Sequence, residues 1–123
     1  MPTPVGLSRG AYANRAQRGD GRTVLPIECT LPPPALPAGR EWSASETERW
    51  AQLWSSPQAS QWDSSVVGLV AALVTYETLI FKDRASAWVA AEARHAYEQL
   101  GLTPRAMAAL NWVIGTEDEG DDQ

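Results

Sequence analysis

The sequence predicts an all-α protein, namely a small helical bundle with a central helical hairpin, an extended N-terminal arm and a disordered acidic C-terminal tail. Three observations support this prediction. Apolar residues recur at helical spacing only after residue 42, seven of the nine prolines lie within residues 1–41, and the last eight residues include five carboxylates. We therefore divide the chain into an arm (1–41), a helical oligomerisation domain (42–115) and a tail (116–123).

The arm is rich in proline, glycine and arginine and shows no helical or strand period. The run Leu31–Pro37 contains four prolines, each of which fixes its own φ and disfavours helical geometry in the residue before it. We expect mobility before about residue 25 and a semi-rigid, extended lead-in over residues 31–40.

The first two helices follow the arm. Ser43 and Glu46 have the capping-box spacing, and Ser45 and Glu48 offer a second register. Trp50, Leu53 and Trp54 continue as an apolar stripe until Pro57. A second helix is expected from about residue 63 to residue 82. Its apolar residues cover so much of its circumference that it must be buried on more than one side.

Two further helices complete the predicted bundle. The third should run from about residue 86 to residue 100, with Gly101 at the C′ position, where glycine adopts the left-handed conformation at low cost. Thr103 and Pro104 then have the residue types of an N-cap and a first helical position, which predicts a fourth helix through about Val113. The polar residues after Gly115 should be disordered.

The helical part is too small to bury all of its apolar surface comfortably. A domain of about 75 residues has little core, yet this chain holds six tryptophans. We therefore predict a homo-oligomer, in which tryptophans near helix starts and one face of the second helix lie between subunits. The predicted interface residues are Trp42, Trp62, Val67, Val70, Val74 and Phe81.

Several classes of function lack the residues they need. The chain has one lysine and no phosphate-binding loop, so it does not have the motif of an ATP-hydrolysing motor. One cysteine and one histidine make a zinc site improbable, and a hydrolytic triad would rest on His95 alone. We expect no enzyme activity, no metal or other cofactor and no disulfide. The most apolar stretch, Val66–Phe81, is shorter than a membrane span and contains Glu77, so we expect no membrane.

The distribution of charge nevertheless allows a nucleic-acid partner. The net charge is −5, but residues 1–40 carry +3, residues 41–115 carry −3 and the tail carries −5. Arginines interleaved with glycines suit phosphate contacts, although a solubilising leader is an equal alternative. Two basic residues after the second helix are a weaker candidate, since a polar turn often has this composition. The candidate DNA-binding residues are Arg9, Arg15, Arg18, Arg22, Arg40, Lys82 and Arg84.

Four segments, in this order and spacing, resemble the helical small-subunit family of tailed-bacteriophage terminases, in the branch without an obvious N-terminal helix-turn-helix. They are Leu36–Trp42 with Thr47–Pro57, then Gln61–Asp63, then Leu100–Ala106, and finally Leu110–Ile114. The glycine- and arginine-rich residues 18–22 also look like the leader of that family. Relatives often carry an arginine where this chain has Val113, so a phosphate contact at that position would be missing here.

The resemblance implies a ring-forming terminase small subunit that binds viral double-stranded DNA and recruits and regulates the large-subunit motor and nuclease in the host cytoplasm. A virion structural adaptor, such as a head–tail completion protein, is the alternative. Co-purification with a motor ATPase and DNA, or with portal and capsid, distinguishes the two. A DNA-binding regulator ranks last, because the third and fourth helices offer only Arg94 and Arg105 to a groove.

Overall fold

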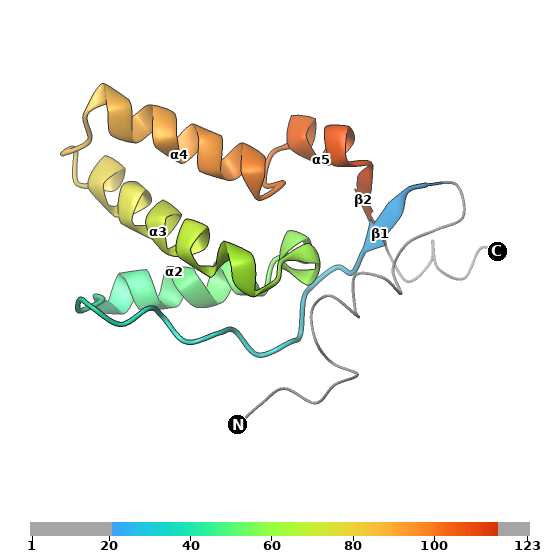
Figure 1. Ribbon diagram of the computed structural model, residues 1–123, viewed down its shortest axis with the longest axis horizontal. Helices are drawn as coiled ribbons and strands as arrows, with labels where there is room; N and C mark the ends of the chain where they lie inside the picture. Colours follow the sequence, from blue (N-terminus) through green and yellow to red (C-terminus); the bar gives the residue numbers. More distant parts are fainter. Residues whose placement is uncertain (1–20, 116–123) are drawn as a thin grey trace.

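A computed structural model of the chain describes residues 21–115 and is mainly helical (Figure 1). The predicted helical character is therefore confirmed, whereas the absence of strands is not, because two short strands form a parallel pair. The elements are β1 (Thr23–Leu25), α2 (Ala44–Trp54), the 3-10 helices η2 (Pro57–Gln61) and η3 (Ser64–Val66), α3 (Val67–Phe81), α4 (Ala87–Gln99), α5 (Pro104–Leu110) and β2 (Trp112–Ile114).

Helix α2 begins with the predicted capping box. The Ser43 hydroxyl accepts from the backbone N–H of Glu46, and the Glu46 carboxylate accepts from the backbone N–H of Ser43. Two otherwise unpaired donors at the helix start are thus satisfied. The helix ends at Trp54, just before the Pro57 that opens η2.

Helix α3 is the central element and packs against both α2 and α4. Asp63 caps the short η3 turn in front of it, as expected from its side chain, and the α-helix itself starts four residues later than Asp63. The segment Ser64–Phe81 has the length and apolar composition to cross a membrane. Here its residues Val70, Leu73 and Val74 form the middle of the core, between the two neighbouring helices.

Helices α4 and α5 follow the predicted caps but α5 is shorter than expected. Ser86 and Thr103 each accept a backbone N–H with their hydroxyl groups, and Gly101 has φ +74°. The expectation that the fourth helix continues through Val113 is wrong. The chain instead turns at Asn111, which has left-handed geometry with φ 64°, and continues as β2. Asparagine adopts the left-handed conformation more readily than most other non-glycine residues, so Asn111 is suited to end a helix.

Residues 21–41 are part of the folded body and do not form a separate arm, contrary to the predicted domain boundary. Strand β1 pairs in register with β2, and Leu25 is fully buried. In the lead-in, the indole N–H of Trp50 donates to the Pro34 carbonyl at 2.8 Å, and that of Trp42 donates to the Pro37 carbonyl at 3.0 Å. The Trp50 bond therefore attaches the lead-in to α2, and the Trp42 bond closes the chain on itself just before that helix.

A cluster of tryptophans fills the core below these elements. The Trp54 ring lies 5.6 Å from that of Trp50 and 5.1 Å from that of Trp62, both in tilted or edge-on geometry. The Trp62 indole donates to the backbone carbonyl of Leu100 at the end of α4. This bond links the segment before α3 to the far end of α4 and fixes the position of α5.

Candidate interaction surface

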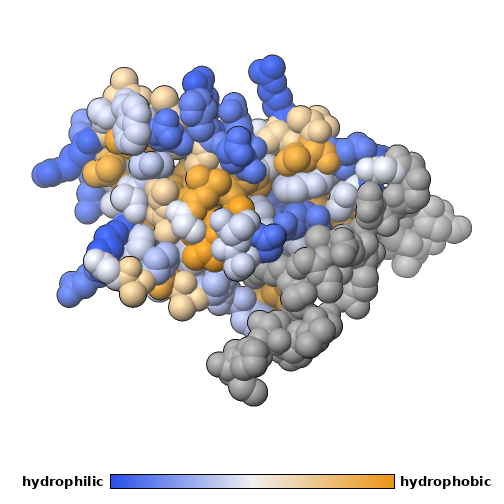
Figure 2. All heavy atoms as spheres, viewed as in Figure 1, coloured by the Kyte–Doolittle hydropathy of each residue, from blue (hydrophilic) through white to orange (hydrophobic). Residues whose placement is uncertain are grey.

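The corner where α3 meets α4 exposes large apolar side chains. Within this corner, which we define as residues 80–88, Phe81 is 82% exposed, Trp88 is 63% exposed and Ile80 is also exposed. Figure 2 shows hydrophobic residues at the surface at this end of the molecule, on the left in the view of Figure 1. Exposure of adjacent large apolar groups is uncommon on a monomer and is typical of an interaction site.

Backbone geometry holds the corner in one shape. The N–H of Asp83 donates to the carbonyl of Ile80 at 3.0 Å, and the N–H of Arg84 donates to that of Leu79 at 2.9 Å. These bonds pair carbonyl groups at the end of α3 that have no partner within the helix. Asp83 adopts the left-handed conformation, with φ 59°, at this turn. Lys82 and Arg84 are exposed beside Phe81. The corner thus combines an apolar knob, Phe81, with two exposed basic residues that follow it in the chain.

Trp88 is held from below by Tyr76 of α3. The two rings meet edge to face, with their centroids 6.3 Å apart. This arrangement is favourable for aromatic pairs and orients the indole on the surface without burying it. Trp88 was not among the predicted interface residues. Its position in the first turn of α4, two residues after the Ser86 cap and outside the predicted apolar stripe of that helix, is the sequence signal that would have identified it.

Those predicted DNA-binding residues that lie within residues 21–115 do not form one patch on the subunit. Arg9, Arg15 and Arg18 lie outside the described residues. Arg22 is exposed beside β1, at the end of the molecule opposite to the α3–α4 corner that carries the two basic residues described above (Figure 1). Within the described part of the chain, Arg22 and the pair Lys82 and Arg84 therefore lie at two separate ends of the subunit.

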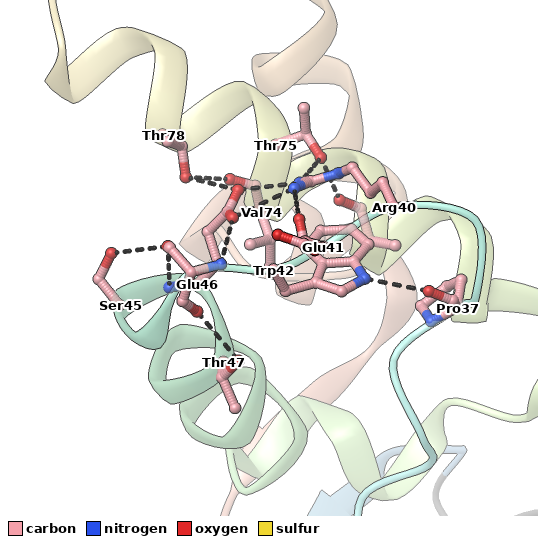
Figure 3. Close-up of polar contacts among 12 residues, drawn as sticks. Pro37, Arg40, Glu41, Trp42, Ser45, Glu46, Thr47, Val74, Thr75 and Thr78 are labelled. Carbon is pink, nitrogen blue, oxygen red and sulfur yellow. Dashed lines mark hydrogen bonds and ion pairs between the residues drawn. The ribbon is translucent and has the colours of Figure 1, made fainter.

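Arg40 is engaged within the subunit, which argues against its predicted role on DNA. Its guanidinium donates to both carboxylate oxygens of Glu46, at 3.2 and 2.9 Å, and to the hydroxyl of Thr75 at 2.9 Å (Figure 3). It also stacks on the Trp42 ring, with its central carbon 3.5 Å from the ring centroid. The bond from Arg40 lowers the pKa of the buried Glu46 to about 2, against the opposing effect of burial. A DNA phosphate would have to displace this pair.

The predicted interface residues divide into buried and accessible groups. Trp62, Val70 and Val74 are buried inside the subunit, because α2 and α4 together cover two sides of α3. The side chains of these three residues are buried by other parts of the same subunit, so they cannot contact a second subunit in this conformation. Trp42 and Val67 are partly buried, and Phe81 alone of the six is fully accessible.

A second ion pair, which the sequence analysis missed, ties three helices together. The Arg49 guanidinium of α2 donates to both oxygens of Glu77 of α3, at 2.8 and 3.0 Å, and the Tyr97 hydroxyl of α4 donates to the same carboxylate. The bond to Glu77 raises the pKa of Arg49, whereas burial, followed by the bond to Glu77, raises that of Tyr97 to about 12. The signal in the sequence was Glu77, the only carboxylate within the apolar run of α3. A charge that is buried in such a run needs a partner of opposite charge.

A surface pocket lies at the opposite end of α4, where α5 packs against it. It has a volume of about 540 Å³ and is lined by Glu98, Gln99, Arg105, Ala106, Ala109 and Leu110. Three of these residues are aliphatic, one is an acid and one is a base. Hydrophobic residues reach the surface over this part of the molecule in Figure 2.

Within residues 21–115, no group of three or more histidine, cysteine or acidic side chains is placed to hold a metal ion. His95 is exposed, and its Nδ1 atom lies 3.6 Å from the Oε2 atom of Glu92 on the same helix. Comparisons with protein-family models, with curated proteins and with solved structures find no match for this chain.

Proposed function

We propose that this chain is a terminase small subunit of a tailed bacteriophage. In this proposal it assembles into a homo-oligomeric ring in the host cytoplasm, binds viral double-stranded DNA, and recruits and regulates the large-subunit packaging motor and nuclease. It has no catalytic activity or cofactor of its own. The support from the sequence is the resemblance of residues 36–114 to that family.

The α3–α4 corner is the observation that carries the proposal. An isolated subunit would keep Phe81 and Trp88 in water, and fully burying one such side chain contributes about 1.5–3 kcal/mol. In the proposed bundle, α3 and α4 form a central hairpin whose tip projects these side chains towards a neighbouring subunit. Lys82 and Arg84 lie on the same tip, so assembly and DNA binding would share one region.

The proposed mode of DNA binding is electrostatic and multivalent. Arginines from the segment ending at Arg22, repeated in every subunit, would gather around the duplex and release its counterions. A charge of +3 in one copy is weak, but repetition around a ring raises the effective affinity steeply. The helical body would remain available to the large subunit.

The test measures binding of a duplex by fluorescence anisotropy across a series of salt concentrations. Replacing Arg9, Arg15, Arg18 and Arg22 together by alanine should weaken binding and flatten its dependence on salt, because fewer phosphates are neutralised. Arg94→Ala is the matched control, since Arg94 is exposed on α4 and outside the proposed site. Unchanged affinity and salt dependence in the fourfold variant would remove the DNA-binding proposal.

A pull-down from infected cells tests the packaging role itself. Recovery of a motor ATPase together with DNA supports the terminase assignment. Recovery of portal and capsid proteins without the motor would instead identify a head–tail adaptor and overturn it.

A further inference from the structure

We propose that the subunits join head to tail, with the Phe81 knob of one copy seated in the α4–α5 pocket of the next. The inference deepens the self-assembly part of the proposed function and does not depend on DNA or on the motor. It rests on two surfaces of the same chain that both combine exposed apolar residues with charges of both signs and lie at opposite ends of α4.

The knob is one side of this contact. Phe81 is the most exposed large apolar residue of the described chain, and Trp88 lies exposed beside it, held by Tyr76. The backbone bonds of the corner keep Phe81 projecting from the end of α3. A rigid aromatic side chain of this kind loses little conformational entropy when it is buried at an interface.

The pocket is the other side. Its volume of about 540 Å³ exceeds what one aromatic ring fills, so it has room for Phe81 and for part of a second side chain. Ala106, Ala109 and Leu110 provide an aliphatic floor, and Leu110 is itself exposed. Small residues in the floor allow a ring to approach the α5 backbone closely.

Charges flank both surfaces and make no ion pair within the described subunit. The knob carries Lys82, Asp83 and Arg84, and the rim of the pocket carries Glu98 and Arg105. Seating the knob brings a base of one copy to Glu98 of the next and Asp83 to Arg105. Rim pairs of this kind contribute little energy but favour one orientation and oppose others.

The geometry makes the contact heterologous. Knob and pocket are separated along α4, whose 13 residues span about 20 Å, so each contact joins two unlike surfaces. In the proposed assembly each subunit gives its knob to one neighbour and its pocket to another. Such contacts continue from copy to copy until the rotation closes a ring. They also bring the basic corner of one copy towards the α5–β2 end of the next, where β1 and Arg22 lie (Figure 1). The basic residues that are separated within a subunit thus meet at each junction.

The experiment measures native mass by light scattering after size-exclusion chromatography, with circular dichroism to verify folding. Phe81→Asp removes the knob and Ala109→Trp fills the pocket. Each variant alone should be monomeric where the wild-type chain is oligomeric, with its subunit dissociation constant raised by at least about thirtyfold. An equimolar mixture should give a 1:1 heterodimer, because one partner retains the pocket and the other retains the knob.

Two matched variants control for adding a charge or a large side chain elsewhere. Ile27→Asp changes another exposed apolar residue, and Ala108→Trp enlarges an exposed position of α5 outside the pocket lining. Both should retain the wild-type mass. Phe81→Ser and Ala109→Gln repeat the test with milder changes if a first variant has lost its helical spectrum.

The outcomes separate this inference from the proposed function. A mixture that contains only monomers, or single variants with wild-type mass, would overturn the head-to-tail contact while leaving self-assembly intact. A wild-type chain that is monomeric at its highest soluble concentration would overturn self-assembly itself, and this contact with it.

Discussion

Removing Arg40 should destabilise the fold in a way that depends strongly on pH. Glu46 is buried, and its two oxygens accept bonds from Arg40, the Ser43 backbone and Thr78. The ordinary pKa of this carboxyl is 4.5 and the folded value is about 2. A shift of this size corresponds to about 3 kcal/mol at neutral pH. Since the Arg40 side chain is 40% exposed, solvent screening reduces its share to about 1–2 kcal/mol.

The sign of the effect follows from the lowered pKa. The ionised carboxylate stabilises the folded state, so the contribution is complete above pH 4.5 and is lost as the pH falls towards 2. Urea unfolding followed by tryptophan fluorescence, at several pH values between 2 and 7, measures it. The difference in unfolding free energy between the wild type and Arg40→Ala should be largest at pH 7 and should shrink towards zero near pH 2.

Glu46→Gln is the companion variant, because it removes the charge and retains the size of the side chain. It should flatten the same part of the pH profile. A destabilisation by Arg40→Ala that is equal at pH 7 and pH 2 would refute this reasoning. It would show that Arg40 acts by stacking on Trp42 and not through its charge on Glu46.

Further predictions concern the other contacts between helices. Gly101→Ala should cost about 2 kcal/mol or more in urea unfolding, because φ is +74° and the added carbon would lie 2.2 Å from the Trp112 ring. Arg49→Ala should cost about 2–3 kcal/mol by the same assay, since Glu77 would be left buried without its charge partner. Tyr97 should ionise only near pH 12 in the ultraviolet spectrum; its raised pKa stabilises the fold below pH 10 and this contribution is lost as the pH rises to 12.

The sequence predicted best those features that depend on neighbouring residues. Ser43 and Thr103 cap their helices as expected, the third helix begins next to the expected residue 86, and Gly101 adopts the left-handed conformation that its position required. Local hydrogen bonds decide these sites, so residue type and spacing are sufficient. The helices that follow Ser43 and Thr103 begin at the expected residues for the same reason.

Features that depend on distant contacts were not predicted. The run Trp112–Ile114 follows a helix directly in the sequence and looked like its continuation. Its pairing with residues 23–25 makes it a strand. The proline-rich residues looked like a free linker because nothing local indicates that the indoles of Trp42 and Trp50 donate hydrogen bonds to their carbonyl groups. The position of Val70 and Val74 inside the subunit likewise depends on the tertiary arrangement. Composition alone does not distinguish burial by a neighbouring helix from burial by a second subunit.

The two-stranded sheet has a mechanical consequence. Strands β1 and β2 are parallel, and they join the beginning and the end of the described chain through bonds such as Gly115 to Leu25. Tension applied between the two ends would load these hydrogen bonds in shear, all together, and would not peel them apart one by one. The sheet therefore acts as a clamp that carries such a load directly from one end to the other and shields the helices between them.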